Sequence, residues 1–170
     1  FPYNVYGILM TGNPNIMPPN CLPYDNTFII IQPNPTAVAN GDSVCEGETI
    51  QLTASGGVSY VWTGPNGFSS TLQNPVIPNA ELGDAGLYTV VVTDVNGCTD
   101  DDTAIVVVNT ANADAGPDQT ICQGENAILT ATGGGTYLWS NGQTTATIVV
   151  SPNFTTVYTV TVTNADGCID

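Results

Sequence analysis

The chain has 170 residues, of which 15 are acidic and none is lysine, arginine or histidine, so its formal net charge at pH 7 is −15. Without cationic side chains it cannot neutralise phosphates, which excludes ordinary nucleic-acid binding and attraction to an anionic membrane surface. Hydrophobic residues make up 42% of the chain, enough for a folded core, and no apolar run approaches the roughly 18 residues of a membrane span.

The first segment, residues 1–33, contains Cys21 and then the apolar run "TFIIIQ", which predicts a β-strand. The stretch "CLPYDNTFIIIQPNP" has the same order as "CTDDDTAIVVVNTAN", which begins at Cys98. Residues 1–33 are therefore expected to hold the C-terminal strands of a preceding repeat. Phe1 is not an initiator residue, and the chain is expected to be a piece of a longer polypeptide.

The second segment, residues 34–110, is predicted to be a complete β-domain. In "TIQLTA" every second residue from Ile50 is apolar, the period of a half-buried strand. The stretch "YTVVVTDVNGC" repeats this alternation from Tyr88 and ends on Asn96-Gly97, a hairpin signal. No window has the 3.6-residue period of a helix, and about seven short strands are expected in each repeat.

The third segment, residues 111–170, repeats the second. "CQGENAILTATGGGTYLW" (122–139) is identical at ten of eighteen positions to "CEGETIQLTASGGVSYVW" (45–62). Cys45 and Cys122 are 77 residues apart, as are Cys21 and Cys98. A repeat of this kind indicates tandem domains. The last domain is expected to lack its final strand, because the chain stops two residues after Cys168.

Two motifs resemble known families. "LGDAGLYTV" (82–90) resembles the Asp-x-Gly-x-Tyr corner of immunoglobulin-like (Ig-like) domains, and Trp62 lies where their strand-C core tryptophan lies. The stretch from "ADAGPDQTICQGENAILTATGGGTYLW" to "YTVTVTNADGC" resembles the PKD-like and Ig-like repeats of giant Bacteroidetes surface proteins, such as SprB-type gliding adhesins exported by type IX secretion. The resemblance implies a head-to-tail array of all-β sandwich domains.

The cysteines depart from the Ig pattern, in which one cysteine lies mid-strand B and one mid-strand F. Cys45 precedes Leu52 of strand B by seven residues, and Cys98 follows Val90 of strand F by eight. Since strands B and F run in the same direction, the two cysteines are expected at opposite ends of the sandwich. At about 3.3 Å per residue they lie tens of Å apart, whereas a disulfide spans about 7 Å at most.

We therefore predict a disulfide between consecutive domains, from Cys45 to Cys168, with Cys21, Cys98 and Cys122 pairing outside this fragment. The alternative is pairing within each domain, Cys45 with Cys98 and Cys122 with Cys168, because spacing alone does not fix connectivity. Cysteines in a short acidic chain favour an oxidising, extracellular location.

The chain has no histidine, lysine or arginine. It therefore lacks the side chains that most often act as general bases, Schiff-base nucleophiles or nitrogen ligands of zinc. We expect no enzyme activity and no required cofactor. Calcium is the metal to consider, with Asp100, Asp101 and Asp102 in "TDDDT" and Asp114 and Asp118 near the domain boundary. The favoured interpretation of these residues is a solvated acidic surface, because no EF-hand spacing is present.

The favoured function is a structural stalk segment of a secreted cell-surface adhesin, and the resemblance implies a part in gliding. Its partners are expected to be neighbouring repeats of the same polypeptide, the secretion or anchoring machinery, and an unknown glycan or abiotic surface. One alternative is a filament subunit assembled by strand donation. Another is a carbohydrate-binding module using Tyr60, Trp62, Tyr137 and Trp139, although their position on strand C makes them core residues first.

Overall fold

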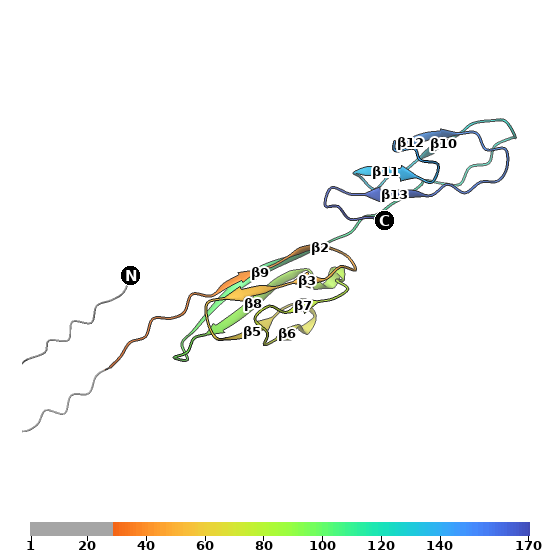
Figure 1. The fold of residues 1–170 in the computed structure, drawn as a ribbon. Helices are drawn as coiled ribbons and strands as arrows, with labels where there is room; N and C mark the ends of the chain where they lie inside the picture. Colours follow the sequence, from red (N-terminus) through yellow and green to blue (C-terminus); the bar gives the residue numbers. More distant parts are fainter. Residues whose placement is uncertain (1–28) are drawn as a thin grey trace, which may run out of the picture. The chain divides into compact units, whose positions relative to one another are not determined.

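The computed structural model describes residues 29–170, and the compact unit Gln32–Asp170 is all-β (Figure 1). Predictions about Cys21 and the rest of residues 1–28 lie outside the described residues. The strands are β1 (Val38–Asn40), β2 (Ser43–Cys45), β3 (Ile50–Gln51), β4 (Thr53–Ser55), β5 (Ser59–Thr63), β6 (Ser69–Ser70), β7 (Val76–Ile77), β8 (Gly86–Thr93), β9 (Thr99–Asn109), β10 (Ala127–Thr130), β11 (Thr136–Trp139), β12 (Thr147–Val150) and β13 (Val160–Thr163).

This unit contains two hydrophobic cores. One is formed by residues from the range 37–108 and the other by residues from the range 115–160. We call the parts of the chain that contain them the first domain (34–110) and the second domain (111–170); these boundaries stay a prediction. The sequence predicted no helix. The described residues nevertheless contain two single 3₁₀ turns, η1 (Pro65–Gly67) and η2 (Leu82–Asp84). Each turn is only three residues long and belongs to a connection between strands.

The first domain is a sandwich of the Ig-like type. One sheet has the order β2-β9-β8-β5-β6, and the pairs β1-β4 and β3-β7 form the opposite layer. The N-terminal strand changes layers: β1 pairs antiparallel with β4, and β2 pairs parallel with β9. Gly41 lies at this change, where a Cβ atom would sit 1.9 Å from the carbonyl oxygen of Ile105. Only glycine lets the two backbones approach this closely.

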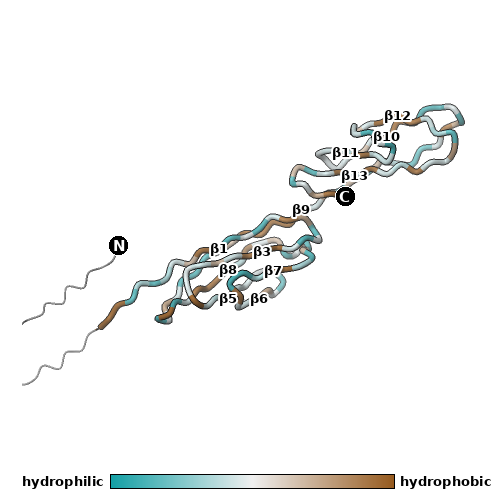
Figure 2. The backbone as a smooth tube through the Cα atoms, in the orientation of Figure 1, coloured by the Kyte–Doolittle hydropathy of each residue, from teal (hydrophilic) through white to brown (hydrophobic). Residues whose placement is uncertain are grey.

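The predicted alternation of apolar residues builds the first core. Ile50 and Leu52 are fully buried, and so are Tyr88, Val90 and Val92 along β8. Figure 2 shows the hydrophobic stretch along β9, which covers this core. The hydroxyl of Tyr88 donates a hydrogen bond of 2.9 Å to the carbonyl oxygen of Asp84. This bond from the tyrosine to the preceding turn is the corner expected from "LGDAGLYTV".

The second domain forms fewer paired strands than the seven or so expected. Its pairs are β10-β12 and β11-β13, both antiparallel. Trp139 belongs to the core of this domain and is 1% exposed. Its ring N–H donates a hydrogen bond to the carbonyl oxygen of Thr145. Residues 115–125 and 152–159 are not assigned to strands. No partner strand corresponding to β9 lies beside β13 among the described residues; only the isolated bridge between Thr163 and Ile169 begins one.

Candidate functional site

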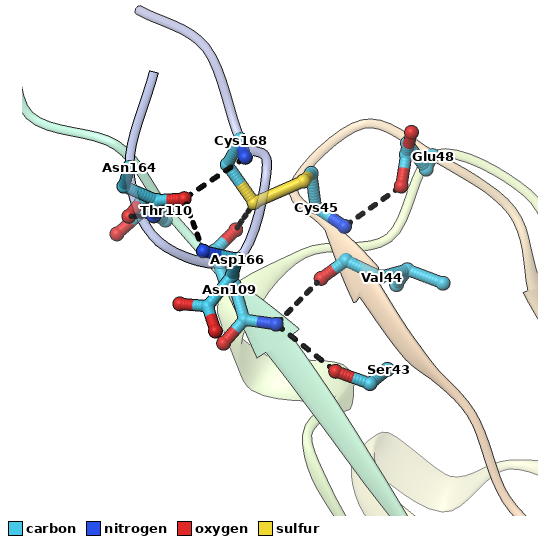
Figure 3. The surroundings of a disulfide bond; sticks show 9 residues. All are labelled: Ser43, Val44, Cys45, Glu48, Asn109, Thr110, Asn164, Asp166 and Cys168. Atoms are coloured by element: carbon cyan, nitrogen blue, oxygen red, sulfur yellow. Dashed lines mark hydrogen bonds between the residues drawn. A yellow bond between two sulfur atoms is a disulfide. The ribbon is translucent and has the colours of Figure 1, made fainter. Parts of the chain in front are cut away.

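The feature with clear functional geometry is a disulfide between Cys45 and Cys168 (Figure 3). The two residues are 123 positions apart in the sequence, and their Cα atoms are 5.5 Å apart, within the usual range for a disulfide. Cys45 is the last residue of β2 in the first domain, and Cys168 follows β13 in the second. The bond therefore joins segments that belong to two different hydrophobic cores.

A tight local turn holds Cys45. Its backbone N–H donates to the side-chain carboxylate of Glu48 at 2.8 Å, and the N–H of Glu48 donates back to the carbonyl of Cys45 at 3.0 Å. Gly47 has a φ of +85° within this turn, a conformation that favours glycine. The sequence "CEGE" thus contains both the hydrogen-bond acceptor and the glycine that the turn requires.

A second local turn holds Cys168. The side-chain oxygen of Asn164 accepts hydrogen bonds of 2.9 Å from the backbone N–H groups of both Asp166 and Cys168. Gly167 has a φ of +86°. This is an Asx-type turn, in which a short side chain takes the place of backbone. The "NADGC" stretch is therefore a preformed hairpin that presents the cysteine.

Hydrogen bonds accompany the covalent link. The side-chain amide of Asn164 donates to the carbonyl oxygen of Thr110 at 2.9 Å, and the backbone N–H of Ala113 donates to the carboxylate of Asp170 at 2.8 Å. The sulfur of Cys168 lies 3.7 Å from the carbonyl oxygen of Asn109 (Figure 3). That is a contact and not a hydrogen bond, because a disulfide sulfur has no hydrogen to donate.

In the described structure Cys45 is bonded to Cys168 and not to Cys98. Cys45 lies opposite Asn109, the last residue of β9, whereas Cys98 directly precedes Thr99, the first residue of that strand. Eleven residues of strand separate the two ends by about 33 Å. Cys98 is a half-buried free thiol and Cys122 is an exposed one, and their pairing outside this fragment stays a prediction.

Both free thiols lie in turns that copy the cross-linked ones. The carboxylate of Asp94 accepts from the N–H groups of Asn96 at 2.8 Å and Cys98 at 2.9 Å, as Asn164 does in the second domain. Desolvation acts to raise the pKa of Asp94, but these backbone hydrogen bonds outweigh it and lower that pKa. Likewise the N–H of Cys122 donates to the carboxylate of Glu125 at 3.1 Å.

Two of the acidic residues considered for calcium, Asp100 and Asp102, have hydrogen-bond partners within the fold. The carboxylates of Asp100 and Asp102 accept hydrogen bonds from the backbone N–H groups of Ala37 and Ala39, at 2.9 and 2.8 Å. These bonds fasten Ala37 and β1 to β9. The pKa of Asp102 is lowered by the backbone N–H groups of Ala39 and Thr103. Between residues 29 and 170 no three histidine, cysteine, aspartate or glutamate residues, Asp101, Asp114 and Asp118 included, gather into a group that could hold a metal ion.

The aromatic residues considered for sugar binding belong to the cores. Trp62 is fully buried, Tyr60 is 8% exposed and Trp139 is 1% exposed, while Tyr137 is half-buried. The hydroxyl of Tyr60 donates to the carbonyl oxygen of Gly57 at 2.9 Å. Tyr60, Trp62 and Trp139 therefore offer no exposed stacking surface for a sugar. In the part of the chain that the structure describes, no helix has the length and hydrophobicity needed to cross a membrane.

The sequence matches no family model, and no curated protein matches it. Solved structures with similar folds include the amphioxus IgVJ-C2 molecule, at 22% identity over 44% of each chain, with a TM-score of 0.39. The three N-terminal domains of the bacteriophage RB49 highly immunogenic outer capsid protein match at 20% identity, over 75% of this chain and 53% of that one, with a TM-score of 0.43. The Ig-like domain of human leucine-rich repeat-containing protein 4 matches at 21% identity, over 56% of this chain and all of that one, with a TM-score of 0.39.

The matched part thus spans less than half of the amphioxus molecule. These likenesses are too distant to support any function, and the assignment of an Ig-like sandwich rests on the strand order of the first domain.

Proposed function

We propose that this chain is a non-catalytic structural segment of an extracellular adhesin stalk, in which disulfides link each domain to the next. The observation that carries the proposal is the Cys45–Cys168 bond between segments of two different cores. Contacts between neighbouring domains of one chain normally permit hinge motion. A covalent bond at the boundary opposes that motion, which suits a part whose work is to transmit force.

The bond also changes how the chain can extend under load. Tension enters through the residues before Cys45 and leaves through those after Cys168, so the disulfide carries it past both cores. The two cysteines are 123 positions apart, which corresponds to about 400 Å of extended chain. That length stays locked for as long as the bond is intact, which is the expected behaviour of a load-bearing tether.

The chemistry of the side chains supports a non-catalytic role. The sequence contains no histidine, lysine or arginine, and these residues supply most general bases, Schiff-base nucleophiles and anion clamps. No observation favours the carbohydrate-binding alternative, since the candidate rings lie in the cores. A binding tip elsewhere in the parent polypeptide is therefore part of the proposal.

The disulfide also supports an oxidising location, at the cell surface. The resemblance to giant Bacteroidetes repeats adds the finer proposal that the parent is a type IX secretion cargo with a part in adhesion and gliding. Its partners are then neighbouring repeats, the export and anchoring machinery, and a glycan or abiotic surface.

Single-molecule pulling on the oxidised chain, with handles at the two termini, tests the role. The expected extension lacks the 400 Å enclosed by the bond, and this length appears in a Cys45→Ser/Cys168→Ser variant. A Cys98→Ser/Cys122→Ser variant is the matched control and should behave like the parent. Peptide mapping without reduction provides a second readout. Release of the full length from the oxidised parent, or a Cys45–Cys98 peptide, would refute the proposal.

A further inference from the structure

The outer face of the five-stranded sheet in the first domain exposes large apolar residues. Leu87, Ile105, Val107, Val61 and Val91 are between 40% and 68% exposed, and we call these five the outer patch. The strand register places Leu87 opposite Ile105 and Val61 opposite Val91. Because side chains alternate along a strand, all five point away from the core and lie on the same face. Apolar residues gathered in this way mark an interaction site.

The positions between the patch residues are almost free of charge. Thr63, Thr89 and Thr103 form one row across β5, β8 and β9, and threonine offers a methyl group as well as a hydroxyl. Asp101 is the one acidic residue at the outward positions of these three strands. This face is therefore neutral and apolar on a chain whose net charge is −15.

The outer patch is a property of this one sheet. β5, β8 and β9 are each paired with a strand on both sides, so the exposure of the patch does not arise from the place where the sequence begins or ends. In the opposite layer, β3 and β4 expose polar residues, Gln51, Thr53 and Ser55. In the second domain the pair that corresponds to Val61 and Val91 is Leu138 and Thr161, in which one apolar residue is replaced by threonine.

We propose that two copies of this chain associate face to face through the outer patch, as a two-fold dimer centred on Leu87 and Ile105. A two-fold axis places the same surface of each copy against itself, so the neutral face of one polyanion meets the neutral face of another. A cationic partner would instead require carboxylates on this face. The inference adds lateral contact between copies to the stalk role, and it does not depend on the disulfide.

The position of Asp101 is compatible with this dimer. Asp101 lies four residues from Ile105, which is about 13 Å along β9. With the two-fold axis running across the strands at Ile105, the two Asp101 carboxylates lie about 26 Å apart along the strands, and interactions are largely screened beyond about 8 Å at physiological ionic strength. The one charge on the face therefore does not oppose the association.

The size of the face sets the expected affinity. Five strands span about 24 Å, and the eight residues of β8 span about 26 Å, so the face covers about 600 Å². This area lies between weak, transient contacts and the roughly 800 Å² per partner of a standard interface. We expect a reversible dimer with a dissociation constant of about 100 µM.

The test measures the mass of the full chain by sedimentation up to about 1 mM protein, ten times that constant. A Cys21→Ser/Cys98→Ser/Cys122→Ser background excludes disulfide-linked oligomers and leaves Cys45–Cys168 intact. Dimers are expected to form, and to form more readily at high salt, because salt screens the repulsion between the two negative copies. A monomer at every concentration and salt would overturn the proposal. Growth beyond two copies would also overturn it, since a two-fold interface closes at the dimer.

Two variants with the same change of charge locate the interface. In that background, Ile105→Asp is expected to weaken the dimer at least tenfold, because it places a charge at the centre of the contact. Val76→Asp is the matched control, at an exposed apolar position of β7 in the opposite layer, and should dimerise like the parent. Both positions are exposed, so the core around Trp62 should keep its fluorescence. Equal effects of the two variants would overturn the proposal.

Cross-linking gives a second readout that needs no loss of association. A cysteine at the centre of a two-fold interface lies close to its own copy across the axis. In the same background, Ile105→Cys is therefore expected to form a covalent dimer under mild oxidation, and Val76→Cys to form much less. Equally rapid cross-linking of the two variants would show that the outer patch is not the contact.

Discussion

The side-chain amide of Asn109 donates a hydrogen bond of 3.1 Å to the hydroxyl oxygen of Ser43 and so ties the end of β9 to β2. The same amide lies 3.4 Å from the carbonyl oxygen of Val44, directly before Cys45. The strand that carries the cross-linked cysteine is therefore fixed to the edge of the first domain by non-covalent contacts as well as by its ladder with β9.

Replacing Asn109 by alanine removes both of these hydrogen bonds. The free energy of unfolding is expected to fall by about 1–2 kcal/mol, since an intramolecular hydrogen bond contributes about 1 kcal/mol. Ser43→Ala removes one of the two bonds and should have about half the effect. Urea unfolding of the oxidised protein measures both values, and equal stability of all three proteins would show that the contacts contribute nothing.

Removing the covalent link should have a larger effect. In the chain-entropy model, a disulfide between cysteines 123 positions apart stabilises the folded state by up to about 5 kcal/mol. The Cys45→Ser/Cys168→Ser variant is therefore expected to unfold at a lower urea concentration than the parent. Cys98→Ser/Cys122→Ser should unfold like the parent, and a parent midpoint that is insensitive to a reducing agent would argue against this contribution.

The tyrosine corner gives a matched pair of substitutions. Tyr88→Phe removes the hydrogen bond to Asp84 at a fully buried position, and is expected to lower the free energy of unfolding by about 1 kcal/mol. In the described residues the hydroxyl of Tyr158 forms no hydrogen bond, and the ring is half-buried. Tyr158→Phe should therefore lower the free energy of unfolding much less than Tyr88→Phe does. A larger loss of stability in Tyr158→Phe would contradict this account of the corner.

The hydrogen bonds to Asp102 predict a pH dependence. Backbone N–H groups of Ala39 and Thr103 lower its pKa in the folded state below the unfolded value of about 3.9. Its stabilising contribution is therefore present above pH 4 and is lost as the pH falls through the folded pKa. The stability difference between the parent and Asp102→Asn should shrink in that acid range. A difference that stays constant from pH 7 to pH 2 would contradict the prediction.

Equivalent leucines in the two domains should differ in importance. Leu52 is fully buried, and Leu52→Ala is expected to cost about 2–5 kcal/mol of stability. Leu129 is only half-buried against the second core, so Leu129→Ala should cost less. Calorimetry at low protein concentration compares them, and equal costs would mean that the second core is closed in solution.

Much of the fold follows from sequence patterns. The period-two alternation from Ile50 and from Tyr88 predicted strands whose apolar residues are buried, and "LGDAGLYTV" predicted the Tyr88 corner. The count of about seven strands was wrong for the second domain, in which four were found in the described residues. A strand needs a partner for its backbone groups, and the segments 115–125 and 152–159 form no ladder with another strand among the described residues.

The candidate site was harder to predict from sequence. The distance along β9 between Cys45 and Cys98 was predictable, because strand length follows from residue count. The contacts of Asn109 and Asn164 were not, since asparagine side chains reach many partners and the sequence does not say which are near. Repetition of the "NGC" and "DGC" hairpins was the available signal, because it places a cysteine in the same turn twice.

The closed loop between Cys45 and Cys168 has a consequence for survival outside the cell. A protease that nicks the backbone once between these residues releases nothing, because the two pieces remain joined through sulfur. Exposed loop tips are the usual sites of such cuts. Releasing a piece of this ring takes a second cut within it or chemical reduction, so a single cut leaves it in one piece.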